Sequence, residues 1–213
     1  MKLITEGYLS QRGRWPAEGR HILAQHDDEG VVVYQAYDPA IGRFAVEHGY
    51  FGGPWKPERM TWIKPNFLWM MFRCGWGTKA QQEMVLAVRL QREAFEAILA
   101  EAVPSTFDGR RYATRADWQG AVKGSSVRLQ WDPDHSPTGA KVERRAIQLG
   151  LRGATTRRYA REWILGIEDV THFVREQRPH ATPSRYERLL LPREEVFRPR
   201  DPAVAERLGL AGG

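Results

Sequence analysis

The chain has 213 residues, of which 42% are hydrophobic and 27% are charged, and its mean hydropathy is −0.55. This composition predicts a globular fold with a sizeable core, and the lack of a long apolar run or of a secretory signal excludes a membrane span and favours the cytoplasm. The 32 Lys and Arg residues exceed the 26 Asp and Glu residues, so the net charge is +6 and a polyanionic partner is favoured.

We expect one domain between two less regular ends. Residues 1–20 are polar and rich in Gly and Arg, and because they show no sustained hydrophobic period they predict an irregular N-terminal arm. Residues 21–192 form the predicted single domain. Residues 193–213 form the predicted C-terminal tail, which we expect to fray from Gly209 onward.

The first strong elements are a strand and a helix. The segment Val31–Tyr37 is β-branched and aromatic, which predicts a buried strand. Asp38 can then cap a helix that has Pro39 at its first position and Gly49 at its end.

Two further strand and helix pairs follow along the chain. The pattern predicts a strand at Arg59–Lys64, a helix at Phe67–Cys74 capped by Asn66, an apolar strand at Met84–Leu90 and a helix at Arg92–Val103.

The C-terminal half has weaker patterns. We predict a short helix at Thr114–Val122, strands at Val127–Trp131 and Arg145–Leu149, and a helix at Arg157–Leu165. The Pro and Gly content of WDPDHSPTG, residues 131–139, predicts a turn with no regular element. The mixed order of elements predicts an α+β fold, a single compact domain with a mixed or antiparallel sheet and flanking helices.

Six long segments occur in a fixed order: YQAYDPAI, RMTWIKPNFLWMMFRCGW, QEMVLAV, QWDP, RRAIQLGLRG and WILGIEDVT. Together they resemble a bacterial family known as domain of unknown function 4291, over the range Gln25 to Pro192. The resemblance implies a cytoplasmic protein and brings no settled reaction, substrate or cofactor. The family continues QWDP with Glu-Arg-Asp, whereas this chain has Asp134, His135 and Ser136, so a role for a Glu-Arg pair there does not carry over.

The segment MTWIKPNFLWMMFRCGWG gathers aromatic residues around Lys64 and Arg73. Because cationic side chains are rarely buried unless they are paired, this pattern indicates an anion pocket lined by aromatic rings. The alternative is a well-packed core with cations at its edge. The residues predicted to bind a nucleotide are Tyr34, Tyr37, Arg59, Thr61, Trp62, Lys64 and Arg73.

Gln81-Gln82-Glu83 lies directly before the apolar strand MVLAV. In ADP-ribosyltransferases a Gln or Glu, any residue and then Glu at this position supplies the carboxylate that stabilises positive charge on the nicotinamide ribose, and the strand order here is similar to compact members of that fold. The similarity implies NAD as cofactor, with Glu83 and Gln35 as catalytic residues. The alternative is a solvated charge in front of a strand.

A third cluster is Arg144, Arg145, Gln148 and Arg152, which we predict to contact phosphate or nucleic acid. The alternative is that an ion pair between Asp132 and an arginine fixes the turn. No zinc, P-loop, serine esterase or Rossmann motif occurs in its required context, and the six histidines show no ligand spacing, so no metal is expected.

Two functions follow from these patterns. The first is a nucleotide-using enzyme of ADP-ribosyltransferase-like fold that transfers from NAD to a macromolecular acceptor such as a nucleic acid. The second is a non-catalytic nucleic-acid-binding module, in which the Arg-rich C-terminal third contacts phosphates and tryptophans stack on unpaired bases. The first function requires Glu83 for turnover, whereas nucleic-acid binding in the second does not depend on Glu83.

Overall fold

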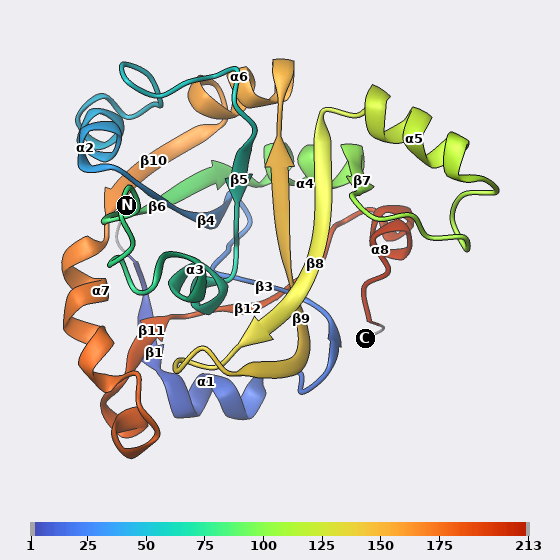
Figure 1. Cartoon of the computed structure of the whole chain (residues 1–213). Coiled ribbons are helices and arrows are strands. Elements are labelled where there is room, and N and C mark those ends of the chain that lie inside the picture. Colours follow the sequence, from blue (N-terminus) through green and yellow to red (C-terminus); the bar gives the residue numbers. More distant parts are fainter. Residues whose placement is uncertain (1–2, 212–213) are drawn as a thin grey trace.

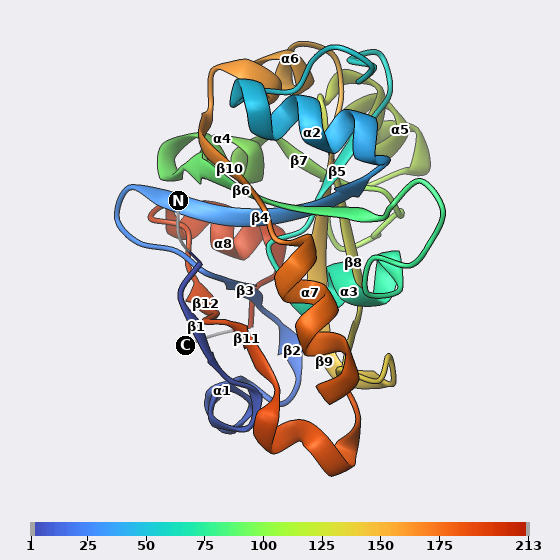
Figure 2. The same cartoon turned by 90° about the vertical axis from the view of Figure 1, so that its left-hand side faces the viewer.

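A three-stranded antiparallel sheet crosses the computed structural model, which describes residues 3–211 (Figures 1 and 2). Its order is β10 (Ile164–Asp169), β6 (Met84–Gln91) and β4 (Gly30–Tyr37), and β4 pairs with β6 along its whole length. Helix α2 lies on one face of this sheet, and helices α3 and α7 lie on the other (Figure 2). Because both faces are covered, the apolar residues of β4 and β6 are buried on both sides, which confirms the two predicted strands.

The second sheet has the order β2-β9-β8-β7, and β5 (Thr61–Ile63) pairs with β9. Its main part is the long hairpin of β8 (Val127–His135) and β9 (Lys141–Leu151). The predicted turn at residues 131–139 is wrong in its first half, because β8 continues to His135. The register shifts between Pro133 and His135, and a proline without an N–H donor is tolerated at such an irregularity.

The α+β class is confirmed, while two predicted helices end earlier than expected. The helix expected at Arg157–Leu165 is α6 (Gly153–Arg161), and Ile164 already begins strand β10, because its β-branched residues pair with β6. The helix expected at Arg92–Val103 is α4 (Arg92–Glu101), and its last predicted residues belong to β7 (Ala102–Pro104), which runs parallel to β8.

Helix capping was predicted correctly. Asp38 accepts a hydrogen bond from the backbone of Ala40 at the start of α2 (Pro39–His48), and Gly49 ends that helix in a left-handed conformation with φ of 73°. Asn66 caps α3 (Phe67–Cys74) in the same way. The other helices are α5 (Arg115–Gly124), which Thr114 caps, α7 (Thr171–Gln177) and the 3₁₀ helices η1 (Arg178–His180) and η2 (Pro183–Arg188).

The predicted irregular arm at residues 1–20 is wrong. This segment contains β1 (Thr5–Gly7), α1 (Tyr8–Arg14) and β2 (Gly19–Arg20), and the side chains of Tyr8 and Trp15 are buried. A few large aromatic anchors hold it in place, and such anchors produce no periodic sequence pattern.

The predicted C-terminal tail also belongs to the fold. Within it, β12 (Glu195–Phe197) pairs with β3 (Ile22–Ala24), and α8 (Pro202–Leu208) packs against α4. Directly before the tail, β11 (Leu190–Pro192) pairs with β1. The backbone N–H of Ala211 still donates to the carbonyl of Arg20. The last two residues, to which the expected fraying also applied, lie outside the described range.

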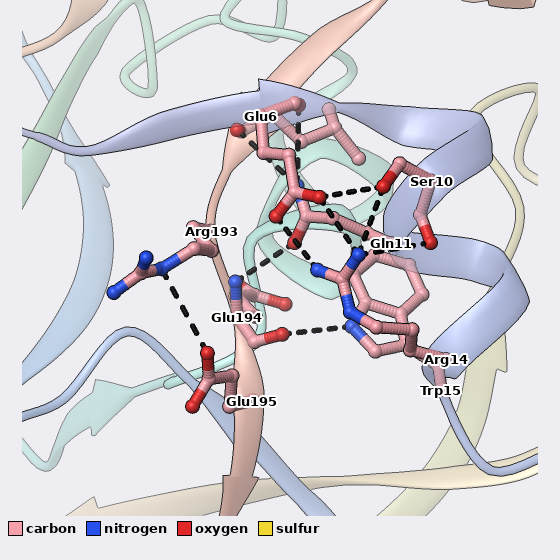
Figure 3. A network of polar contacts seen from close by, with 9 residues as sticks. Glu6, Ser10, Gln11, Arg14, Trp15, Arg193, Glu194 and Glu195 are labelled. Atoms are coloured by element: carbon pink, nitrogen blue, oxygen red, sulfur yellow. Dashed lines mark hydrogen bonds and ion pairs between the residues drawn. The ribbon is translucent and has the colours of Figure 1, made fainter.

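Polar contacts tie the two ends of the chain together (Figure 3). The backbone N–H of Glu194 donates to the side-chain oxygen of Gln11 at 2.8 Å, and the indole of Trp15 donates to the carbonyl of Glu194 at 2.9 Å. On the solvent side Arg14 forms an ion pair with Glu6 at 2.7 Å. Within residues 3–211, no helix combines the length and the apolar character that crossing a membrane requires.

Candidate functional site

A cavity of about 710 Å³ lies where the end of β4 meets β5 and α3. One face of the β8–β9 hairpin and the loop before β6 complete its wall. The sequence-predicted site residues that line it are Gln35, Tyr37, Arg59, Thr61, Trp62, Lys64, Arg73 and Gln148.

A backbone bridge between the two sheets positions the cationic wall. The N–H of Tyr34 donates to the carbonyl of Lys64 at 2.7 Å, so the end of β5 lies against β4. Pro65 then ends the strand, and Asn66 begins α3, which carries Arg73 to the same cavity. Lys64 and Arg73 therefore share one wall although nine positions separate them.

The cavity wall carries an excess of positive charge. Lys56, Arg59, Lys64 and Arg73 line it, and Asp38 is its one lining carboxylate among the described residues. Within residues 3–211 none of these four cationic side chains forms an ion pair. An excess of unpaired cations in a concave site favours an anionic ligand.

Lys64 is the most constrained of these cations. Its side chain is 5% exposed, and its ammonium makes no hydrogen bond within the part of the chain that the structure describes. Burial, together with the nearby Arg73, lowers its pKa from 10.5 to about 8, while Asp132 acts in the opposite direction. A buried cation without a protein partner is costly, and a bound anion would remove that cost.

Hydrogen bonds fix the wall around Gln35. Its amide nitrogen donates to the Tyr37 hydroxyl at 2.8 Å and to the Trp62 carbonyl at 3.2 Å, and its oxygen accepts from the Tyr159 hydroxyl. The indole of Trp55 also donates to the Tyr37 hydroxyl, at 3.2 Å. These bonds occupy the amide of Gln35, so in this arrangement it orients the aromatic wall.

Trp62 reaches the cavity across the surface of the β5–β9 pair. It lies opposite Gly150 in the strand register, and a Cβ at that position would be 3.0 Å from the indole and 2.8 Å from the sulfur of Met60. Because Gly150 has no side chain, the side chains of Trp62 and Met60 can lie over its backbone.

Gln130 and Gln148 line the cavity on the β8–β9 hairpin, and Asp132, outside the cavity wall, fixes their amide network. The amide nitrogen of Gln148 donates to Gln130 at 2.8 Å and to Asp132 at 2.7 Å. The predicted ion pair between Asp132 and an arginine is wrong, since Asp132 forms no ion pair among residues 3–211 and the arginine of this hairpin pairs with Asp134 instead.

The model of a protein family described as Domain of unknown function (DUF4291) matches residues 21–197. The chain belongs to the DUF4291 family. The match includes every element of the cavity wall, from β4 to β9, and it confirms the resemblance found in the sequence. A comparison with curated proteins gave no match.

Two of the residues predicted for nucleotide binding and catalysis in this DUF4291 protein, Tyr34 and Glu83, do not line the cavity. Tyr34 is fully buried on the opposite face of β4, where its ring packs edge-to-face on Phe67 at 5.2 Å. Glu83 follows Gln81 and Gln82, which do line the cavity, but its own side chain is not part of the wall. Of Tyr34, Arg59 and Glu83, whose convergence the sequence leaves open, only Arg59 lines the cavity. Alternation along β4 turns Tyr34 away from the face that Gln35 and Tyr37 share.

The predicted phosphate-binding cluster is also separated in the DUF4291 fold. Arg144 is buried, forms an ion pair with Asp134 at 2.6 Å and donates to the carbonyl of Pro16 at 2.6 Å. Arg152 donates to backbone carbonyls at the end of α5, including that of Ser125 at 3.0 Å. Arg145 is exposed, and Gln148 alone lines the cavity.

Sequence reasoning missed several lining residues of this DUF4291 protein. The loop GGPWKP contains a tryptophan and a lysine that the sequence could have indicated as site residues. The position of Gln130 opposite Gln148 follows only from the pairing of β8 with β9. The missed residues are Trp55 and Lys56, whereas Gln81, Gln82 and Gln130 belong to segments that the sequence singled out without predicting that these side chains line the cavity.

Proposed function

We propose that this cavity binds a phosphorylated nucleotide and that the protein acts on or through that nucleotide in the cytoplasm. The observation that carries the proposal is Lys64, a residue that is 5% exposed, whose ammonium has no partner among residues 3–211 and which lies in a wall with Arg59 and Arg73. Ammonium and guanidinium groups that converge in a concave site are the usual partners of phosphate oxygens.

The rest of the wall suits the nucleoside. Trp62 and Tyr37 offer aromatic surface for stacking, and the side chains of Gln81, Gln82 and Gln130 offer donors and acceptors for the edge of a base. A volume of about 710 Å³ is in the range of small-molecule and cofactor sites.

A thermal-shift screen tests this proposal. AMP, ATP and NAD are added to the purified protein, and a nucleotide at about 100 times its dissociation constant should add about 2.7 kcal/mol of stability. We expect a concentration-dependent rise in melting temperature for at least one of the three. If none of them changes the melting temperature and calorimetry detects no binding, the proposal is wrong.

ADP-ribosyl transfer from NAD to a macromolecular acceptor, on an ADP-ribosyltransferase-like fold, is the second candidate function. One observation favours it: a carboxylate oxygen of Glu83 is buried and has no hydrogen-bond partner within residues 3–211, directly after two residues of the cavity wall. A ligand that extends past Gln82 would meet this carboxylate, which could then stabilise positive charge on a ribose.

Replacing Glu83 with glutamine tests that function. If Glu83 acts electrostatically on the ribose, Glu83→Gln should lower NAD turnover by a factor of at least about 100 and leave nucleotide affinity nearly unchanged. Turnover is followed by release of nicotinamide, with the exposed Glu47→Gln variant as the control. Turnover at the wild-type rate in Glu83→Gln would remove ADP-ribosyl transfer by this residue.

Anion binding should depend on pH through Lys64. Its folded-state pKa of about 8 means that the free protein loses this positive charge above that pH, so an anion must then bind together with a proton. We expect affinity for AMP to fall by about 30-fold between about pH 7 and pH 9.5. Calorimetry at the two values measures the change, and a Lys64→Met variant should lack most of this dependence.

The same pKa gives the sign of a stability effect. Because the folded pKa lies below the ordinary value of 10.5, charged Lys64 destabilises the ligand-free fold below about pH 8. That cost disappears as the pH rises from about 8 to 10.5. The contribution of Lys64 to ligand-free stability therefore increases in the pH window in which anion affinity decreases.

The non-catalytic nucleic-acid module is less favoured in the form that the sequence suggested. Arg144 and Arg152 are engaged with protein partners, and most tryptophans are buried among apolar residues. A phosphate surface built from the Arg-rich C-terminal third would need those side chains to leave their partners.

A further inference from the structure

A second hollow adjoins the cavity at the open edge of β8. Strand β7 pairs with β8 only as far as Pro104 opposite Leu129, and beyond this point the edge of β8 borders a hollow of about 180 Å³. Gln130 lines both this hollow and the cavity. Gln130 therefore borders both spaces. Helix α8 and the loop before α5 lie beside β8 (Figure 1).

A third hollow continues in the same direction. It has a volume of about 520 Å³ and lies between the loop after β7 and helix α8. Pro104 and Arg111 line both the second and the third hollow. Shared lining residues thus place the three spaces next to one another, from the cavity to the edge of β8 and on to α8.

The second hollow is lined by two arginines, Arg20 and Arg111, and by two aspartates, Asp108 and Asp132. Burial together with Arg111, Arg145 and Arg110 lowers the pKa of Arg20. Asp108 supplies a counter-charge and pairs with Arg111 at 3.5 Å. The guanidinium of Arg20 makes no ion pair or hydrogen bond within residues 3–211. Like Lys64, it is a partly enclosed cation without a protein partner.

Each space combines a cation with an aromatic side chain. Lys64 and Trp62 line the cavity, Arg20 and Trp131 line the second hollow, and Arg111 with Tyr112 lines the third. Repeated pairs of a cation and a stacking ring are typical of sites that bind single strands, in which cations contact phosphates and rings contact bases. A mononucleotide would use the first pair alone.

We propose that the nucleotide in the cavity is one unit of a single-stranded nucleic acid, whose next units pass Gln130 and occupy the hollows at Arg20 and Arg111. This inference rests on the proposed nucleotide-binding function. It adds that the partner is a polynucleotide and that the second and third spaces supply affinity of their own.

Binding as a function of length tests the inference. The affinity of AMP is compared with that of single-stranded RNA and DNA oligonucleotides of two, four and eight units. We expect affinity to rise at least about tenfold from AMP to the four-unit strand and to weaken with salt, because additional phosphates are contacted. The RNA and DNA series identify which sugar is preferred.

A double variant localises the additional affinity. Arg20→Ala with Arg111→Ala should lower affinity for the four-unit strand at least about tenfold and change AMP affinity less than about twofold. The matched control, Arg157→Ala with Arg175→Ala, removes the same charge from two exposed arginines without side-chain partners and should change neither affinity. The single variant Arg20→Ala, which keeps the ion pair of Arg111 with Asp108, serves as a second probe if the double variant is unstable, and it should also lower strand affinity without changing AMP affinity.

The outcomes separate this inference from the proposed function. AMP binding with no gain for longer strands would overturn the polynucleotide path and leave nucleotide binding intact. Loss of strand affinity in the control pair as large as in Arg20→Ala with Arg111→Ala would also overturn it, because the effect would then come from net charge alone. Failure of both AMP and oligonucleotides to bind would remove both proposals.

Discussion

Replacing Lys64 with methionine should weaken nucleotide binding strongly and at the same time raise the melting temperature. The ammonium is buried in the cavity wall without a partner among residues 3–211, so its removal takes away a phosphate ligand and also a desolvation cost. A pKa lowered from 10.5 to about 8 corresponds to roughly 3 kcal/mol of destabilisation at neutral pH. Lost contact with a phosphate should weaken binding roughly 100-fold.

Calorimetry with AMP and thermal unfolding without ligand measure the two effects. For a chain of this size we expect the melting temperature to rise by roughly 6–12 °C. Lys123→Met, at an exposed position of α5, is the control and should change neither quantity. A Lys64→Met protein that binds AMP as well as the wild type, or that is less stable, would contradict the role given to this residue.

Replacing Arg144 with methionine should have the opposite pattern, a large loss of stability with unchanged nucleotide binding. Its partner Asp134 is 1% exposed, and removing one member of a buried ion pair typically costs about 3–5 kcal/mol. The buried Glu194 increases this cost, since burial and the nearby Asp134 already raise its pKa. The carbonyl of Pro16 and the ring of Trp15 also lose their contacts with the guanidinium.

Chemical denaturation measures the loss, and AMP titration at a temperature at which the variant is folded measures affinity. Arg145→Met, one position along β9 and exposed, is the control and should change the free energy of unfolding by less than about 0.5 kcal/mol. If Arg144→Met weakens AMP binding as strongly as Lys64→Met does, Arg144 belongs to the binding site and the distinction between the two residues is wrong.

Local patterns predicted the parts of the cavity that lie close together in the chain. The caps at Asp38 and Asn66 fixed the ends of α2 and α3, and the cations between β5 and α3 indicated a pocket that the structure then shows. These inferences depended on neighbouring residues, for which capping and alternation are reliable guides.

Contacts between distant segments could not be predicted in this way. The sequence does not indicate that Arg144 has an ionic partner and that Lys64 has none. The register of β8 and β9 brings Asp134 to Arg144. Glu83 was expected in the cleft because of three adjacent residues, but the face to which its side chain turns depends on how β6 pairs. Likewise, local sequence patterns could not predict that β10 pairs with β6, because the two strands are far apart in the chain.

The contact between the two ends of the chain has a practical consequence for work on the isolated domain. The range matched by the family, residues 21–197, contains β11 but leaves out β1, its partner, together with the helix that carries Gln11 and Trp15. A fragment cut at those limits would expose the unpaired edge of β11 and the surface that Trp15 covers in the full chain. An unpaired strand edge can pair with another copy of the fragment, which promotes aggregation. The family match thus marks a shorter unit than the one whose strands and helices pack together in the structure.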